Sequence, residues 1–541
     1  MGGRFLLVIA GIFAAYAFVI FHLYGIQLSQ GTDYLARAGS QYANSGVLQA
    51  NRGTIYFTDK NGNHYAAAIN KEYPIIFSSP KEIDNPKQTA TALSGLLNIP
   101  ESQLAKTFSA STTYASLVKK ADHELVSKVN SLELKGIHIG SYVGRYYPLE
   151  KVGAQLLGYV GFTDDDIQRG AYGVEKYFDE ELSGIAGKII AGKITSPEPG
   201  VDLYLTIDQN IQQEANRILA RVVEEYHAKG GAFIVQEPTT GKILAMGGYP
   251  AFDPNDFGAY AISEFLNPVV QQVYEPGSVM KVITMAGGID SGKITPETTY
   301  FDKGSLELNG RTIKNWDLIS HGTVSMTTVI EQSINTGAAF AQRAMGNQNF
   351  KNYLVRFGFG DKSGIDLPGE LKGDMKKLFA SDAPAITFAT ASYGQGIATT
   401  PLQVINAFSA IANGGALMKP YVNTAESPKK IRNVIKKESA RKISNMMLSA
   451  VDKAKIAAIS GYTVAGKTGT AFLPDFQNGG YTDKVVNTYV GFAPINEPRF
   501  TILFKLDEPA NAPLAGTTVV PAFHDLAQFI LNYYNVPPDR L

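Results

Sequence analysis

The chain contains one short stretch whose side chains are suited to nucleophilic catalysis. Ser278 and Lys281 are three residues apart in an apolar segment that follows Pro276 and Gly277, and this spacing places both on one face of a predicted helix. A serine hydroxyl becomes nucleophilic when a neighbouring base takes its proton. A lysine serves as that base when apolar surroundings lower its pKa. The pattern therefore predicts Ser278 as a nucleophile and Lys281 as its base.

Ser-x-x-Lys spacing is weak evidence alone, because short motifs recur by chance. Four other pairs have this spacing: Ser78/Lys81, Ser116/Lys119, Ser427/Lys430 and Ser439/Lys442. We expect residues 119–134 to form an amphipathic helix, and the pairs at Ser116 and Ser439 to lie on helix surfaces. Ser278 must therefore be distinguished by other elements.

A second polar pair, Ser333 and Asn335, forms the only Ser-x-Asn sequence in the chain. It lies in a predicted loop and helix region over residues 327–344. A hydroxyl and an amide can relay a proton and orient a peptide group. The alternative is a helix cap or a surface pair, which is the usual role of an isolated Ser-x-Asn.

A third group, Lys467, Thr468, Gly469 and Thr470, lies in a predicted strand over residues 463–471. The lysine suits an anion, and the threonine hydroxyls can donate to it. A glycine inside a strand indicates close approach of a ligand or another backbone. The similar sequence Lys362-Ser363-Gly364 is expected in a loop, so we set it aside.

The elements around these groups predict an α+β domain over residues 201–541. A strand, a helix capped by Asp208 and a hairpin come first, a mostly helical stretch carries the first two groups, and three strands and a helix close the chain. This order predicts an antiparallel sheet with helices on both faces.

The first 200 residues contain no comparable group. Residues 5–27 carry no charge and are long enough to span a bilayer. The bulky residues 20–24 at the end of this stretch offer no good small-x-small cleavage site. This favours a retained anchor over 1–28, with the remainder outside the cytoplasm, rather than a signal peptide. Residues 29–200 alternate short strands and helices, and we expect an elongated, non-catalytic α+β pedestal domain.

Composition excludes several classes of function. Among 541 residues, Lys+Arg and Asp+Glu are both 49, so no basic field favours nucleic acid. The chain has no cysteine, which excludes disulfides and thiolate chemistry. Its seven histidines show no metal-binding spacing, and we expect neither a metal nor a cofactor.

The three groups, in this order, form the motif set of penicillin-binding proteins and β-lactamases. The chain resembles a class B penicillin-binding protein over nearly its whole length. Further segments that carry the resemblance are 52–53, 59–62, 145–148, 173–175, 274–277, 364–370 and 393–396. One position departs from the pattern, because Lys60 stands where the family usually has arginine.

The resemblance implies a peptidoglycan D,D-transpeptidase. Ser278 would attack the penultimate carbonyl of a D-Ala-D-Ala stem peptide, D-alanine would leave, and an amine from a second stem would form the crosslink. The other implied roles are Lys281 as base, Ser333 as proton relay, Asn335 as orienting amide, Lys467 with Thr468 and Thr470 as carboxylate site, and the N–H groups of Ser278 and Thr470 as oxyanion hole.

The resemblance also implies acylation by β-lactams, attachment to the cytoplasmic membrane, and partners that include a polytopic membrane glycosyltransferase and cell-division proteins. Residues 274–277, which directly precede Ser278, resemble the corresponding segment of septal transpeptidases more than that of elongation transpeptidases. Three alternatives stay open: an elongation transpeptidase, an enzyme that hydrolyses its acyl-serine (a D,D-carboxypeptidase or β-lactamase), and a non-catalytic scaffold or β-lactam sensor. A β-lactamase is disfavoured by the anchor, the large N-terminal module and the lack of a Glu-x-x-Leu-Asn sequence.

Overall fold

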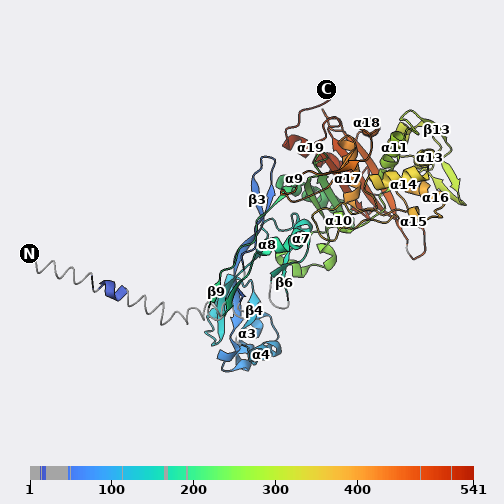
Figure 1. Cartoon of the computed structure of the whole chain (residues 1–541). Helices are drawn as coiled ribbons and strands as arrows, with labels where there is room; N and C mark the ends of the chain where they lie inside the picture. Colours follow the sequence, from blue (N-terminus) through green and yellow to red (C-terminus); the bar gives the residue numbers. More distant parts are fainter. Residues whose placement is uncertain are drawn as a thin grey trace, which may run out of the picture. The chain divides into compact units, whose positions relative to one another are not determined.

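The computed structural model describes residues 13, 15–19, 47–48, 50–112, 114–163, 168–190, 193–475, 477–512 and 514–540. The chain divides into two compact units that alternate along the sequence (Figure 1). The first unit comprises Met1–Gly53, Asn70–Arg145 and Ser183–Val201, and the second comprises Thr54–Ile69, Tyr146–Leu182 and Asp202–Leu541. The predicted domain boundaries at residues 28 and 200 stay predictions.

The predicted membrane anchor over residues 1–28 falls on a part of the chain of which the structure describes only 13 and 15–19. Of the residues that the structure describes, none belongs to a helix with the length and hydrophobicity needed to span a membrane. The anchor therefore stays a prediction.

The first unit is built on the later part of β3, which pairs with β4 and β5. Its elements are β1 (Val47–Leu48), β3 (His64–Ser78, shared with the second unit), η2 (Pro80–Glu82), α3 (Pro86–Leu97), α4 (Glu101–Phe108), β4 (Ala115–Lys119), α5 (His123–Asn130), β5 (Ile137–Tyr146), β8 (Gly187–Ile190) and β9 (Lys193–Thr195). A small core of buried residues packs α3 and α4 against this sheet.

The helix predicted over residues 119–134 is wrong in its first part. Ser116 and Lys119 lie in strand β4, antiparallel to β3, so they are not a pair on a helix surface. The helix α5 begins only after Asp122, whose side chain caps it by accepting from the Leu125 N–H. The partner strand, which is distant in sequence, decides the conformation of residues 115–119.

The second unit contains the residues predicted to be catalytic. Its first elements are β2 (Ile55–Thr58), α6 (Ala154–Leu157), β6 (Val160–Phe162), β7 (Gln168–Gly170), α7 (Gly173–Tyr177), α8 (Asp179–Ser183), β10 (Leu203–Asp208), α9 (Gln209–Glu225), β11 (Gly230–Gln236), β12 (Ile243–Tyr249), η3 (Pro254–Ala259), η4 (Ile262–Phe265), α10 (Pro268–Gln271), η5 (Gly277–Val279) and α11 (Met280–Asp290). The middle is formed by β13 (Thr299–Asp302), β14 (Ser305–Leu308), β15 (Arg311–Lys314), β16 (Gly322–Ser325), α12 (Met326–Glu331), α13 (Asn335–Met345), α14 (Asn347–Arg356), α15 (Lys376–Phe379), α16 (Ala385–Ala391) and α17 (Pro401–Ala412). The last elements are β17 (Ala416–Met418), β18 (Lys430–Asn433), α18 (Lys437–Ala454), β19 (Ala465–Pro474), β20 (Tyr481–Ala493), β21 (Phe500–Asp507) and α19 (Val519–Tyr533).

A five-stranded antiparallel sheet, in the order β12-β11-β21-β20-β19, forms the centre of the second unit. Alternate residues of each strand point to opposite faces. Phe233 and Val235 of β11 join a core with α9 and α19, whereas Ile234 joins a core with α11 and α17. The predicted α+β fold, an antiparallel sheet with helices on both faces, is thereby confirmed.

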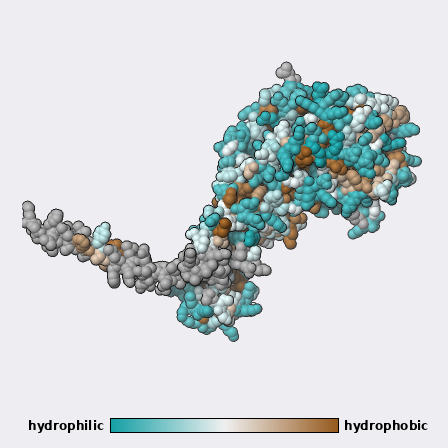
Figure 2. Space-filling view, viewed as in Figure 1, coloured by the Kyte–Doolittle hydropathy of each residue, from teal (hydrophilic) through white to brown (hydrophobic). Residues whose placement is uncertain are grey.

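The visible face of the second unit is mostly hydrophilic, with smaller hydrophobic areas between the hydrophilic residues (Figure 2). This surface agrees with the composition of the chain, in which 18% of residues are charged and 45% hydrophobic. The hydrophobic residues instead fill the two layers of core on either side of the sheet.

Candidate active site

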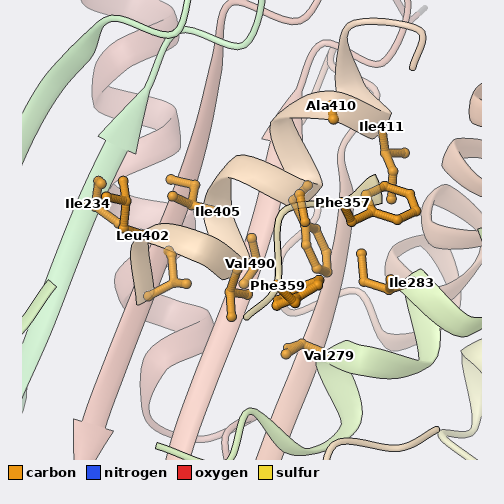
Figure 3. Packing of buried hydrophobic residues seen from close by; sticks show 14 of the residues in the cluster. Ile234, Val279, Ile283, Phe357, Phe359, Leu402, Ile405, Ala410, Ile411 and Val490 are labelled. Atoms are coloured by element: carbon orange, nitrogen blue, oxygen red, sulfur yellow. The ribbon is translucent and has the colours of Figure 1, made fainter. Parts of the chain in front are cut away.

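The helix α11 holds Lys281 inside the protein. The residues around this lysine are apolar, and Val279 and Ile283 point into the same core as Phe359 and Phe357 (Figure 3). The 3-10 turn η5 precedes α11 and carries Ser278 one turn before Lys281. Lys281 is 0% exposed, so its amine has no contact with solvent. The hydroxyl of Ser278 contacts the amine in this buried position.

Four of the predicted side chains meet around this amine. The Nζ of Lys281 lies 2.9 Å from the Oγ of Ser278, 3.0 Å from the Oγ of Ser333 and 2.5 Å from the Ser333 carbonyl oxygen. On the other side, the Nζ of Lys467 lies 3.0 Å from the same Ser333 Oγ. A continuous chain of polar contacts therefore links the proposed nucleophile to Lys467 through Lys281 and Ser333.

Burial changes the charge state of both amines. It lowers the pKa of Lys281 well below the ordinary lysine value, and the nearby charge of Lys467 lowers this pKa further, while the carboxylate of Asp317 acts in the opposite direction. Burial also lowers the pKa of Lys467 to about 7. The lowered pKa favours the neutral form of Lys281, whose lone pair can take the serine proton, while Lys467, with a pKa of about 7, is partly charged at neutral pH.

Strand β19 brings Lys467 to the site because it is the edge strand beside η5. A Cβ at Gly469 would lie 2.8 Å from the backbone oxygen of Pro276, which confirms the predicted close approach of another backbone. The Lys467 Nζ also donates to the carbonyl and hydroxyl oxygens of Thr468, at 3.1 and 3.2 Å. Thr470 donates to Asn487 on β20 at 3.3 Å.

Ser333 and Asn335 lie between α12 and the first turn of α13. The backbone of Ser333 has φ of +57°, a left-handed conformation that is costly for a residue with a Cβ and that clusters at functional sites. The Asn335 side-chain amide donates to the carbonyl of Lys314 at 2.9 Å. Among the contacts of the described residues, none joins Asn335 to Lys281, so its predicted orienting role toward Lys281 stays a prediction.

A buried polar network that the sequence motifs do not indicate supports this segment. Asp302 is fully buried and accepts from the hydroxyl of Thr336 at 2.6 Å and the amide of Asn315 at 2.8 Å. Hydrogen bonds to the carboxylate outweigh its burial, so the pKa of Asp302 is lowered. Because Thr336 follows Asn335, the network fixes the start of α13 and with it the left-handed turn at Ser333.

Trp316, the only tryptophan of the chain, lies beside the same segment. Its indole N–H donates to the carbonyl of Gln332, the residue before Ser333, at 3.0 Å. The residue is nevertheless 58% exposed. Its ring is therefore anchored at one edge, next to the polar groups of the site, and presents the rest of its surface to solvent.

Glu275, three residues before Ser278, is a further acidic group that the motif search did not select. Its carboxylate accepts from the Tyr481 hydroxyl at 3.0 Å and from the Gly396 N–H at 3.0 Å. Burial raises the pKa of Glu275 above the ordinary glutamate value, and the two hydrogen bonds act in the opposite direction. Its closeness to the nucleophile in sequence was the signal that could have indicated it.

The alternative Ser-x-x-Lys and Lys-Ser-Gly sequences lie elsewhere in the structure. Ser439 is in helix α18 as expected, but it is buried rather than on the surface, because this side of the amphipathic helix packs into the core. Lys362 is exposed in a loop, as predicted, and lines a separate cavity of about 390 Å³. The structure therefore places Lys467, and not Lys362, with Ser278.

We expect Lys467→Ala to lower the rate of acylation by penicillin about 10²-fold, the loss typical of removing one group that stabilises developing charge. Lys362→Ala is the matched control, and it should change the rate less than about twofold because an exposed lysine outside the site contributes little. Stopped-flow acylation of both folded variants measures the difference. Equal losses would contradict the assignment of Lys467 to the site.

Two family models match separate parts of the chain. Residues 231–528 match the penicillin binding protein transpeptidase domain, and residues 47–193 match the penicillin-binding protein dimerisation domain. The transpeptidase match includes every predicted site residue and all of the five-stranded sheet except Gly230, the first residue of β11.

Characterised proteins are similar over nearly the full length. Stage V sporulation protein D of Bacillus subtilis is 29% identical over 549 residues, covering 95% of this chain and 83% of that protein. Peptidoglycan D,D-transpeptidase FtsI of Escherichia coli K12 is 28% identical over 563 residues, covering 99% and 93%. The crystal structure of penicillin binding protein 3 from Mycobacterium tuberculosis, complexed with aztreonam, matches with a TM-score of 0.70 at 25% identity, covering 92% of this chain and 99% of that one.

Proposed function

The chain belongs to the penicillin-binding proteins of class B, which are peptidoglycan transpeptidases, and we propose that it crosslinks stem peptides through an acyl-serine intermediate on Ser278. The observation that carries this proposal is the placement of the Lys281 amine, which is buried and 2.9 Å from the Ser278 hydroxyl oxygen. A neutral amine in this position can take the serine proton as the oxygen attacks a carbonyl.

In the proposed reaction, Ser278 attacks the penultimate carbonyl of a stem peptide that ends in D-Ala-D-Ala. Lys281 takes the hydroxyl proton, and Ser333, 3.0 Å from Lys281, passes a proton to the departing D-alanine. Lys467, with Thr468 and Thr470, receives the terminal carboxylate. An amine of a second stem peptide then attacks the acyl-serine and releases Ser278.

The N–H groups of Ser278 and Thr470 are proposed to bind the oxygen that becomes negative in each transition state, a contribution of about 10²–10³ in rate for each donor. β-Lactams are expected to acylate Ser278 by the same attack on a carbonyl. The complex of the similar Mycobacterium tuberculosis protein with aztreonam supports this extension.

The products of the reaction test the proposal. With a synthetic donor peptide and an amine acceptor, we expect a crosslinked dimer together with free D-alanine, measured by liquid chromatography and mass spectrometry. Free D-alanine without dimer would indicate a carboxypeptidase instead. Neither product, from a folded protein, would support the non-catalytic alternative.

We further propose a single N-terminal membrane anchor, an extracytoplasmic catalytic unit and a septal role with a glycosyltransferase and division proteins as partners. The length of the uncharged segment 5–27 supports the anchor. The similarity of residues 274–277 to septal enzymes supports the septal role. Depletion in growing cells tests the role, because filaments would agree with septal synthesis and spheres with elongation. Protease treatment of spheroplasts should digest an extracytoplasmic unit and spare a cytoplasmic one.

A further inference from the structure

A cavity of about 390 Å³ lies in the second unit, in a part of the domain that the proposed reaction does not use. Its walls come from the loop that follows α14, from α17 and from the hairpin of β17 and β18. Of the described residues that line it, none takes part in the steps proposed above. The volume is within the range of about 300–1,000 Å³ usual for small-molecule sites, so the cavity can hold a small organic ligand.

The loop that forms one wall, residues 357–364, is held in place by two buried side chains. Gln403 of α17, 3% exposed, donates from its side-chain amide to the carbonyl of Asp361 at 2.8 Å. Glu370, 6% exposed, accepts from the N–H of Ser363 at 2.7 Å. This wall is therefore fixed before any ligand binds, which reduces the entropy that binding must cost.

Three nitrogen groups on the walls have hydrogens left for a ligand. Asn406, only 5% exposed, accepts from Gln236 at 3.2 Å through its side-chain oxygen, but its side-chain nitrogen donates to none of the described residues. Arg432 donates from Nε and Nη2 to two carbonyls at the end of α14, at 2.8 and 2.7 Å, and its Nη1 has no such acceptor in the described part of the chain. Lys362 is exposed, and no ion pair between described residues includes it. All three groups line the cavity, so they can donate to one ligand.

The remaining walls are apolar. They come from three side chains, those of Phe357, Leu417 and Ile431. Phe357 is held from behind, because it packs in the same core as Ile283 and Ile411 (Figure 3). A ligand therefore meets a fixed apolar surface opposite the nitrogen donors, and this surface suits a hydrocarbon or aromatic body.

The charges of the lining favour an anion. Lys362 and Arg432 carry positive charge and Asp361 carries negative charge, so the lining has one net positive charge. A guanidinium group beside further N–H donors suits the oxygens of a carboxylate or a phosphate, because such charge-assisted hydrogen bonds are about twice as strong as neutral ones. The cavity therefore fits a molecule with an apolar body and one anionic group.

We propose that this cavity is a second ligand site of the chain, and that it binds a small organic molecule with one carboxylate or phosphate group. The anionic oxygens accept from Lys362, Arg432 and Asn406, and the apolar body lies against Phe357. The site does not depend on the proposed function, since none of its residues acts on Ser278 or on the stem peptides.

Binding of small aromatic anions to the full-length chain tests the proposal. Benzoate and phenyl phosphate carry the two anionic groups on the same apolar ring, and benzamide is the neutral counterpart of benzoate. In titrations followed by saturation-transfer-difference NMR, we expect a Kd of about 1 mM for at least one anion. Benzamide should bind about tenfold more weakly, because it lacks the charge-assisted hydrogen bonds. The tighter of the two anions identifies the class of ligand, whereas equal binding of anions and benzamide, or no saturable binding, would overturn the proposal.

Three variants locate the bound anion. Lys362→Glu should raise its Kd about fivefold, because attraction is lost and repulsion is added at an exposed position where folding is not at risk. Lys372→Glu, an exposed lysine outside the cavity, is the matched control and should leave the Kd unchanged. Lys467→Ala, which removes the proposed carboxylate site next to Ser278, should also leave it unchanged. Binding that is lost in Lys467→Ala and kept in Lys362→Glu would place the anion in the candidate active site, and binding kept in all three would be non-specific. Either result would overturn the second site.

Discussion

Replacement of Ser278 by alanine is expected to abolish covalent labelling of the chain by a fluorescent penicillin. Without its oxygen no acyl ester can form, and the loss of a nucleophilic serine costs about 10⁶ in rate in a comparable enzyme. Labelling is measured by gel fluorescence after denaturation, at a protein concentration that gives a strong signal for the wild type. Folding is checked by thermal melting of both proteins.

Two other serines of the chain that occur in Ser-x-x-Lys sequences serve as controls for Ser278→Ala. Ser116 in β4 and Ser427 also precede a lysine by three residues, but neither lies on a helix with that lysine. Ser116→Ala and Ser427→Ala should therefore keep full labelling. Labelling that survives in Ser278→Ala would remove the basis for the acyl-serine mechanism.

Lys281→Arg is expected to lose acylation as severely as Lys281→Ala, by about 10²–10⁴, although it keeps a long cationic side chain. A lysine with an ordinary pKa of about 10.4 would be neutral in roughly one molecule in 2,500 at pH 7. Burial of Lys281 lowers its pKa and so increases the neutral fraction, whereas an arginine does not give up its proton in proteins. Second-order acylation rates of the three proteins across pH measure the effect, and substantial activity in the arginine variant would exclude the general-base role.

The pH dependence of the acylation rate tests the same hypothesis, because the direction of its change can be predicted. The wild-type rate should rise with pH as Lys281 loses its proton, and this rise should occur well below pH 10. Because the charge of Lys467 helps to lower the pKa of Lys281, Lys467→Met should move the rise to higher pH. The move should be partial, since burial is the larger cause. A rise at the same pH in both proteins would show that the two amines do not interact.

The sequence predicts the catalytic elements well where the signal is local. Ser278 and Lys281 share a face because they are one helical turn apart, and Gly469 marks a close backbone contact, which a glycine inside a strand often indicates. These features depend on neighbours in sequence, which a single chain displays.

The features that were missed depend on partners far apart in sequence. Asp302 and Thr336 are separated by 34 residues, and no spacing rule connects a buried carboxylate to the turn it supports. Strand β4 forms because an edge of β3 is available, against its helix-like pattern. The hydrogen-bond partner of Asn335 is the backbone carbonyl of Lys314. The position of this carbonyl depends on the folded hairpin of β14 and β15.

The position of Trp316 makes its fluorescence a probe of the surroundings of the candidate active site. Because the chain has no other tryptophan, its indole emission comes from one point, the ring whose N–H is bound to the carbonyl next to Ser333. Indole emission excited selectively therefore reports the surroundings of this one ring, beside the candidate active site, without a contribution from another tryptophan. Acylation of Ser278 is therefore expected to change this emission, which can be measured on the unlabelled chain.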